Sequence, residues 1–133
     1  MTQDIDRVKR KRLLSFLSAA NFGIEIEEHR VQLSTQSLSR YPHSKKFGSR
    51  RFNPYFQTDF SESQEELVTA PQTSSEEALS QLHELQMILA STLEEDEIVW
   101  PLSMPPHLKN EDTDFLLTHF ERPWYQEYRD YLA

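Results

Sequence analysis

The sequence predicts an α+β fold in which a partial antiparallel sheet is flanked by helices. Residues 23–33 alternate apolar and polar side chains, which is typical of a strand with one buried face. Residues 75–93 instead carry an apolar stripe at helical spacing, formed by Ala78, Leu82, Leu85 and Leu89. Along the chain the predicted order is α, β, β, α, β, α, which mixes the two kinds of element without the regular alternation of a parallel α/β fold.

Bulk composition fits a single domain of 133 residues. The chain has no cysteine, which removes disulfides and thiolate metal sites and suits a reducing, cytoplasmic location. No apolar run approaches the ~20 residues of a membrane span, so no membrane association is expected. The basic residues Lys9–Arg12 precede a short apolar run, but the acidic residues before them argue against a signal peptide.

Charge is distributed unevenly between the two halves of the chain. Residues 1–51 hold 11 Lys and Arg against 5 Asp and Glu, a net charge of +6. Residues 52–133 hold 3 against 17, a net charge of −14. Because such an acidic body repels phosphate backbones, the sequence does not predict nucleic-acid binding.

Local signals place the remaining elements. A loose helical period predicts a helix over residues 4–20, and the Ser-, Arg- and Pro-rich stretch 34–58 is expected to be mostly loop. "TDFSES" is typical of a turn before a second strand, "QEELVTAP". The helix over 75–93 begins with a capping box in which Ser74 is the N-cap and Glu77 follows three residues later. Residues 98–133 are predicted to form a short strand, a loop and a C-terminal helix.

Several catalytic and cofactor motifs are absent. With only two glycines, the chain has neither a Walker loop nor a dinucleotide-binding fingerprint. "HELQM" at 83–87 lacks the second histidine of a zincin helix, so it is interpreted as a polar helix surface and zinc is not expected. The sequence therefore assigns no catalytic residue.

Two glutamates lie side by side on the first predicted strand. Because side chains alternate and each residue rises ~3.3 Å, Glu25 and Glu27 project from one face about 6.6 Å apart. Ile24 and Ile26 then face the core on the other side. The spacing allows two oxygen ligands to reach one cation or two neighbouring cations, but a solvated surface strand has the same pattern.

Asp59 and Glu66 form a second acidic group. They are seven residues apart and would point to opposite faces of an unbroken strand, so residues 61–63 must turn or bulge for both to join one site. Carboxylates brought ~4 Å apart repel by about 4 kcal/mol per pair at an effective dielectric of 20. A hard cation such as Mg²⁺ removes that conflict. The alternative is that these acids never meet and each is separately solvated.

Four stretches give the sequence its resemblance to a known family: "FGIEIEEHRV", "HSKKFGS", "NPYFQTDFSESQEELVTAP" and "WPLSMPP". In these motifs and their order the chain resembles bacterial glutamate–cysteine ligase, including the ligase half of the bifunctional glutathione biosynthesis protein. The resemblance covers about residues 20–133. It implies an N-terminal piece of a glutamine-synthetase-like ligase fold.

The resemblance also implies roles for particular residues. Glu25, Glu27, Asp59 and Glu66 match the acids that bind magnesium ions, within the segment 23–71. Tyr128 and Leu132 match positions that line the cysteine pocket. The implied ligands are Mg²⁺, ATP, L-glutamate and L-cysteine. The stretch "WPLSMPP" is interpreted as packing rather than chemistry.

The implied reaction is the first step of glutathione biosynthesis. The γ-carboxylate of glutamate attacks the γ-phosphate of ATP, and the amine of cysteine then attacks the acyl phosphate. Ile26 departs from the Lys or Arg usual between the two strand glutamates, and a family ligase domain is several times longer than this chain. We therefore expect an N-terminal fragment that is inactive alone and needs the missing C-terminal part of the ligase. The alternatives are a non-catalytic remnant that binds cations or docks onto a protein, and an acidic interaction protein with no site.

Overall fold

The computed structural model describes residues 2–49, 52–58, 61–104 and 106–108, together with Glu127 and Tyr131. In this part of the chain a five-stranded antiparallel sheet packs against helices, which confirms the α+β prediction. The strands are β1 (Glu25–Gln32), β2 (Ser37–Leu38), β3 (Phe56–Gln57), β4 (Gln64–Val68) and β5 (Glu97–Trp100). The helices are α1 (Thr2–Leu17), α2 (His43–Phe47) and α3 (Ser75–Thr92).

Strand β1 organises the sheet because it pairs with three others. Its first half pairs with β4 in the register Glu25↔Val68 to His29↔Gln64, and its second half pairs with β2 and β5. His29 has partners in both β4 and β5, so these two strands lie on opposite edges of β1. β3 then pairs with the outer edge of β4.

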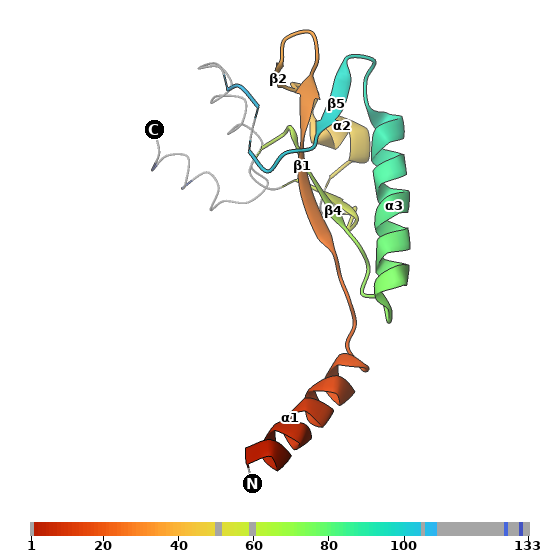
Figure 1. Cartoon of the computed structure of the whole chain (residues 1–133). Helices are drawn as coiled ribbons and strands as arrows, with labels where there is room; N and C mark the ends of the chain where they lie inside the picture. Colours follow the sequence, from red (N-terminus) through yellow and green to blue (C-terminus); the bar gives the residue numbers. More distant parts are fainter. Residues whose placement is uncertain are drawn as a thin grey trace.

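Helix α3 covers one face of the sheet, as Figure 1 shows. Its buried side chains are Ala78, Leu82, Leu85 and Leu89, the stripe that the sequence predicts. Three of these leucines form the core with Phe56 and Leu67, and Ile24 and Ile26 pack against them from β1. The backbone N–H of Glu77 donates to Ser74 Oγ over 3.2 Å, which confirms the predicted N-cap.

The prediction of mostly loop over residues 34–58 overlooks three short elements there, β2, α2 and β3. These elements are two to five residues long, too short for a periodic pattern, and they form because tertiary contacts hold them. Lys46 of α2, for example, donates to the carbonyl of Thr92 at the end of α3 over 2.7 Å. Gly48 then ends α2 at φ 76°, a conformation that glycine adopts without strain.

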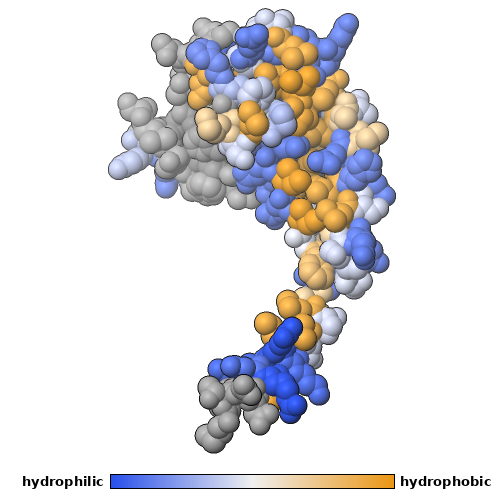
Figure 2. Space-filling view, in the orientation of Figure 1, coloured by the Kyte–Doolittle hydropathy of each residue, from blue (hydrophilic) through white to orange (hydrophobic). Residues whose placement is uncertain are grey.

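Helix α1 stands away from the sheet at the end of an extended connection (Figure 1). It begins and ends two to three residues before the predicted bounds of 4–20. Every side chain described in α1 is exposed, including Phe16 at 77%. In the space-filling view, hydrophilic side chains dominate the visible face of this helix (Figure 2).

No helix in the described part of the chain is long and apolar enough to cross a membrane. The predicted C-terminal helix lies outside the described ranges, apart from Glu127 and Tyr131.

Candidate functional site: an acidic sheet face

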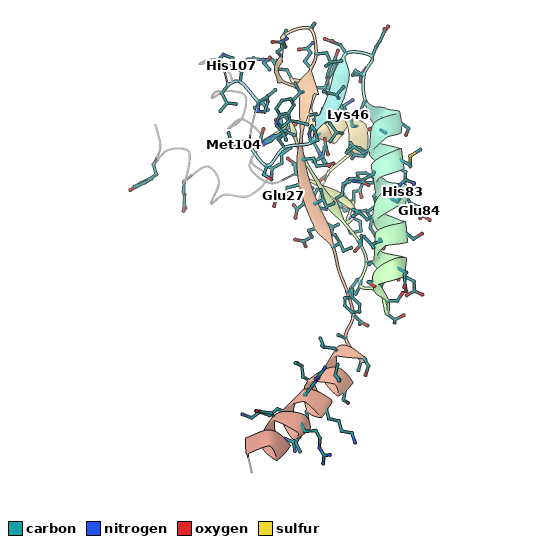
Figure 3. The ribbon with its side chains drawn as sticks, in the orientation of Figure 1. Glu27, Lys46, His83, Glu84, Met104 and His107 are labelled. Carbon is teal, nitrogen blue, oxygen red and sulfur yellow. The ribbon has the colours of Figure 1, made fainter. Side chains whose placement is uncertain are left out.

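The face of the sheet opposite α3 carries the two glutamates of β1. Glu25 and Glu27 are exposed, while Ile24 and Ile26 pack against the core on the other face. Figure 3 shows Glu27 extending from β1 on the side away from α3. The alternation predicted for this strand is therefore confirmed, and it leaves both carboxylates on the open face.

Glu66 lies directly opposite Glu27 in the pairing of β4 with β1. Directly opposed residues of antiparallel strands have Cβ atoms about 5 Å apart and point to the same face. The Gln64 side chain lies on this face too and donates from Nε2 to Glu27 Oε2 over 2.9 Å. The structure thus brings Glu25, Glu27 and Glu66 onto one face.

The turn before β4 matches the break that the sequence requires. Gln64 N–H donates to the carbonyl of Ser61 over 3.0 Å, and Thr58 Oγ1 donates to the same carbonyl over 2.5 Å. Ser61 Oγ lies 2.8 Å from Ser63 Oγ and also accepts from the Ser63 backbone N–H. Asp59 lies outside the described residues, so its share in the site stays a prediction.

The described carboxylates of the open face do not converge on a common metal position in this structure. Across the described ranges, no group of three or more His, Asp or Glu side chains is arranged to hold a metal ion. Three carboxylates on one strand pair, one of them held by an amide, are nevertheless the hard oxygen donors that Mg²⁺ prefers.

His29 is a further polar residue on the open face, and the sequence analysis did not single it out. It follows Glu27 by two residues, and its Nδ1 lies 3.3 Å from Ser63 Oγ. Burial lowers the pKa of His29 below its ordinary value, so the neutral imidazole is favoured. The period of two along β1 was the signal that could have found it.

The opposite face carries a buried charged cluster that sequence reasoning missed entirely. Arg30 is fully buried, with Nε 2.6 Å from Glu65 Oε1 and Nη1 2.7 Å from Glu97 Oε1. Nη2 donates to the carbonyls of Tyr41 and Glu62 over 2.7 and 2.6 Å. The two Nη groups make hydrogen bonds as a planar fork, whereas the contact of Nε with Glu65 is an ion pair without hydrogen-bond geometry.

Further groups complete this cluster around Arg30. His43 Nδ1 lies 2.6 Å from Glu65 Oε2, and Lys46 Nζ lies 2.8 Å from Glu97 Oε2. Burial is the largest influence on Glu97 and would raise its pKa. Hydrogen bonds from the Glu94 backbone, Lys46 and Ser39, with the charge of Arg30, outweigh burial and lower that pKa. Glu28, opposite Glu65 in the strand pairing, has its pKa raised by burial.

An apolar cavity of about 520 Å³ opens beside β5. Its walls include Val31, Ile98, Trp100 and His107. Trp100 Nε1 donates to the carbonyl of Met104 over 2.7 Å, which closes the "WPLSM" turn. Tyr128 and Leu132, the expected cysteine-pocket residues, lie outside the described part of the chain.

Comparison with known proteins identifies the class to which this antiparallel fold and acidic face belong. The sequence model of the glutamate-cysteine ligase family matches residues 5–123, so the chain belongs to the glutamate–cysteine ligase family. The match extends through nearly all of α1 and the whole described sheet.

Individual relatives agree with this assignment. The glutathione biosynthesis bifunctional protein of Streptococcus agalactiae is 40% identical over 113 residues, which are 85% of this chain and 15% of the relative. A glutamate–cysteine ligase of Clostridium acetobutylicum is 44% identical over 98 residues, covering 74% of this chain and 20% of the relative. This chain therefore spans only a small part of the length of the curated relatives that it matches.

Solved structures carry the same fold. A bifunctional glutathione synthetase from Pasteurella multocida superposes with a TM-score of 0.75 at 34% identity, covering 94% of this chain and 16% of that chain. The glutamate–cysteine ligase of Francisella tularensis, solved in complex with AMP, gives a TM-score of 0.64 at 32% identity, with 71% and 19% coverage.

Proposed function

We propose that this chain supplies the cation-binding strands of an ATP-dependent glutamate–cysteine ligase active site. The observation that carries the proposal is the register in which Glu27 opposes Glu66, with Glu25 on the same face. Membership of the ligase family supports it, because the matched residues include both strands. Asp59, which lies between β3 and β4 in the sequence, is proposed as the fourth ligand.

The proposed ligands are Glu25, Glu27, Asp59 and Glu66, and the proposed ions are Mg²⁺. Bound there, magnesium would neutralise ATP phosphate oxygens and hold them in line for transfer to the γ-carboxylate of glutamate. The chain's own part is to hold the carboxylates on a rigid strand pair. Gln64 orients Glu27 by donating to its Oε2, as the outer shell of a metal site does.

The remainder of the active site is proposed to come from other ligase segments. The chain covers 15–20% of the curated ligases that it resembles, and Glu25 and Glu27 are exposed on the open face of the sheet. Tyr128 and Leu132 are proposed to contribute to the cysteine pocket of that assembled enzyme. By itself the chain is proposed to bind the cation and to turn over no ATP.

Cation binding by the 133-residue chain tests this proposal. Titration with Mn²⁺, followed by its electron paramagnetic resonance signal, is expected to show binding that excess Mg²⁺ displaces. Glu27→Gln should weaken binding roughly tenfold or more, because a ligand is lost. The matched control is Glu84→Gln, whose side chain is exposed on α3 (Figure 3), and it should bind as the parent does.

Two outcomes would contradict the proposal. The first is a chain that binds no Mn²⁺ at millimolar concentration, which would remove the cation site. The second is equal Mn²⁺ affinity of Glu27→Gln and the parent, which would show that Glu27 is not a ligand of the bound ion. Release of ADP in the presence of glutamate and cysteine by the chain alone would overturn the claim that other segments are needed.

A further inference from the structure

Strand β4 has a sequence that does not specify its own register. Its last four residues are Glu65, Glu66, Leu67 and Val68, two acids followed by two apolar residues. Because side chains alternate, a slip of one residue would send Glu65 to the open face and Glu66 to the core. Val68 would then replace Leu67 in the core. The strand's own pattern therefore tolerates both registers.

We propose that the buried Arg30–Glu65 ion pair is a register key, which selects Glu66 for the open face beside Glu27. Arg30 and Glu65 are both completely buried, and their Nε and Oε1 atoms lie 2.6 Å apart. The second oxygen of Glu65 lies 2.6 Å from His43 Nδ1. Only the observed register gives this buried carboxylate two partners. In the slipped register Arg30 would meet the wrong residue.

The same arginine also fixes the length of the turn that feeds β4. Its Nη2 donates to the carbonyl of Glu62 over 2.6 Å, and its backbone N–H donates to the carbonyl of Ser63 over 2.7 Å. The His43 backbone N–H donates to Glu62 Oε2 over 2.8 Å. A slip of β4 would have to break all three bonds, because the turn would gain or lose a residue.

Arg30 is therefore a positioning residue for the open face, although its side chain lies on the opposite face. It holds Glu65, and the strand period then delivers Glu66 to the position opposite Glu27. The geometric part of this inference is independent of what binds at the open face. Its consequence for cation affinity rests on the proposed function.

Disulfide trapping tests the register directly, because the chain has no cysteine of its own. Glu27→Cys/Glu66→Cys joins opposed residues and should close a disulfide under mild oxidation with diamide. The matched control, Glu28→Cys/Glu66→Cys, pairs residues that oppose one another only after a slip of one residue. It should stay open. Closure is read as the loss of two hydrogens by mass spectrometry.

Adding Arg30→Met should lower closure of the first pair roughly tenfold and raise closure of the control pair. Adding Glu65→Leu to Arg30→Met should restore the parent pattern, because the strand then has apolar side chains on both sides of Glu66 and specifies its register by burial. Where Arg30→Met does not fold by circular dichroism, Arg30→Lys replaces it, since lysine keeps the charge but lacks the fork that reaches the Glu62 carbonyl. Unchanged closure in the Arg30 variant would overturn the proposal.

Cation binding separates positioning from stability. Arg30→Lys should weaken Mn²⁺ binding roughly tenfold, as loss of an outer-shell partner does. Leu85→Ala destabilises the core without touching the turn before β4, so below its unfolding temperature it should bind Mn²⁺ as the parent does. Equal losses in both variants would overturn the positioning role. Absence of Mn²⁺ binding in the parent would contradict the proposed function. The disulfide experiment would then still test whether the Arg30–Glu65 pair sets the register of β4.

Discussion

Glu65 and Glu66 are neighbours in β4, yet they lie in opposite environments. Glu65 is fully buried between Arg30 and His43, whereas Glu66 is half-buried on the open face opposite Glu27. One step along a strand turns the side chain over, and this step exchanges a structural carboxylate for a candidate ligand. Residue type alone therefore says little about the role of an acid in this chain.

The carboxylates on the two faces of the sheet also lie in different surroundings. The core face has its own cations, since Arg30 and Lys46 contact Glu65 and Glu97 directly. On the open face, Gln64 donates its amide N–H to Glu27, and burial favours the neutral imidazole of His29. Exposed carboxylates are accessible to an external cation, while a buried cluster of paired charges is suited to fixing the fold.

The largest expected effect on the free energy of unfolding comes from replacing Arg30, the buried arginine of the core face. Arg30→Met leaves Glu65 and Glu97 each with one partner fewer. Breaking a buried pair by deleting one member costs about 3–5 kcal/mol of the free energy of unfolding. Urea denaturation followed by circular dichroism measures this loss. The double variant Arg30→Met/Glu65→Leu should recover most of it. A single variant as stable as the parent would show that the buried pair is dispensable.

A smaller effect separates the two neighbouring glutamates themselves. Glu65→Gln should lower the free energy of unfolding by about 1–3 kcal/mol, because buried donors of Arg30 and His43 lose a charged acceptor. Glu66→Gln should lower it by less, because Glu66 is half-buried on the open face whereas Glu65 is fully buried. Mn²⁺ affinity should fall most in Glu66→Gln, which loses a proposed ligand, and less in Glu65→Gln, which weakens the ion pair with Arg30 that is proposed to set the register. Equal stability losses in the two variants would contradict the contrast between the faces.

The lowered pKa of Glu97 predicts a pH-dependent part of the stability. Because the folded pKa lies below the unfolded value of 4.5, the contribution is complete above pH 4.5 and is lost as pH falls through the folded pKa. One proton gives a slope of at most about 1.4 kcal/mol per pH unit. The stability gap between the parent and Glu97→Gln should thus be constant above pH 4.5 and narrow below it.

Denaturation at a series of pH values measures this gap. Glu84→Gln, an exposed carboxylate on α3, serves as the control and should show no gap at any pH. A gap for Glu97→Gln that widens on acidification would mean that the sign assigned to the Glu97 shift is wrong.

Local rules were sufficient to predict α3 and the acidic face of β1. A capping box and an apolar stripe are decided within a few residues, and alternation alone separates Glu25 and Glu27 from their isoleucine neighbours. The meeting of Glu27 with Glu66 came from the family resemblance, because strand pairing depends on residues far apart in sequence. Asp59, Tyr128 and Leu132 stay predictions, since they lie outside the described residues.

The buried cluster could not be predicted because its partners are distant in the chain. Arg30 and Glu97 are 67 residues apart, and the Glu62 carbonyl is 32 residues from Arg30. In sequence, Arg30 occupies a position typical of the polar end of a surface strand. An arginine can be buried only where several chain segments together provide acceptors for the N–H groups of its guanidinium. The short elements β2, α2 and β3 escaped prediction for the same reason.

The smallest expected effect tests a local interaction far from both groups of carboxylates. Ser74→Ala removes the acceptor for the Glu77 backbone N–H at the start of α3 and should cost about 1 kcal/mol. The matched control is Ser75→Ala, the next residue, which is exposed and should behave as the parent does. Because α3 packs on the core face, the loss should appear in urea denaturation and leave Mn²⁺ affinity unchanged. A weakened affinity in Ser74→Ala would show that the helix start and the open face are coupled, which would contradict the separation of the two faces.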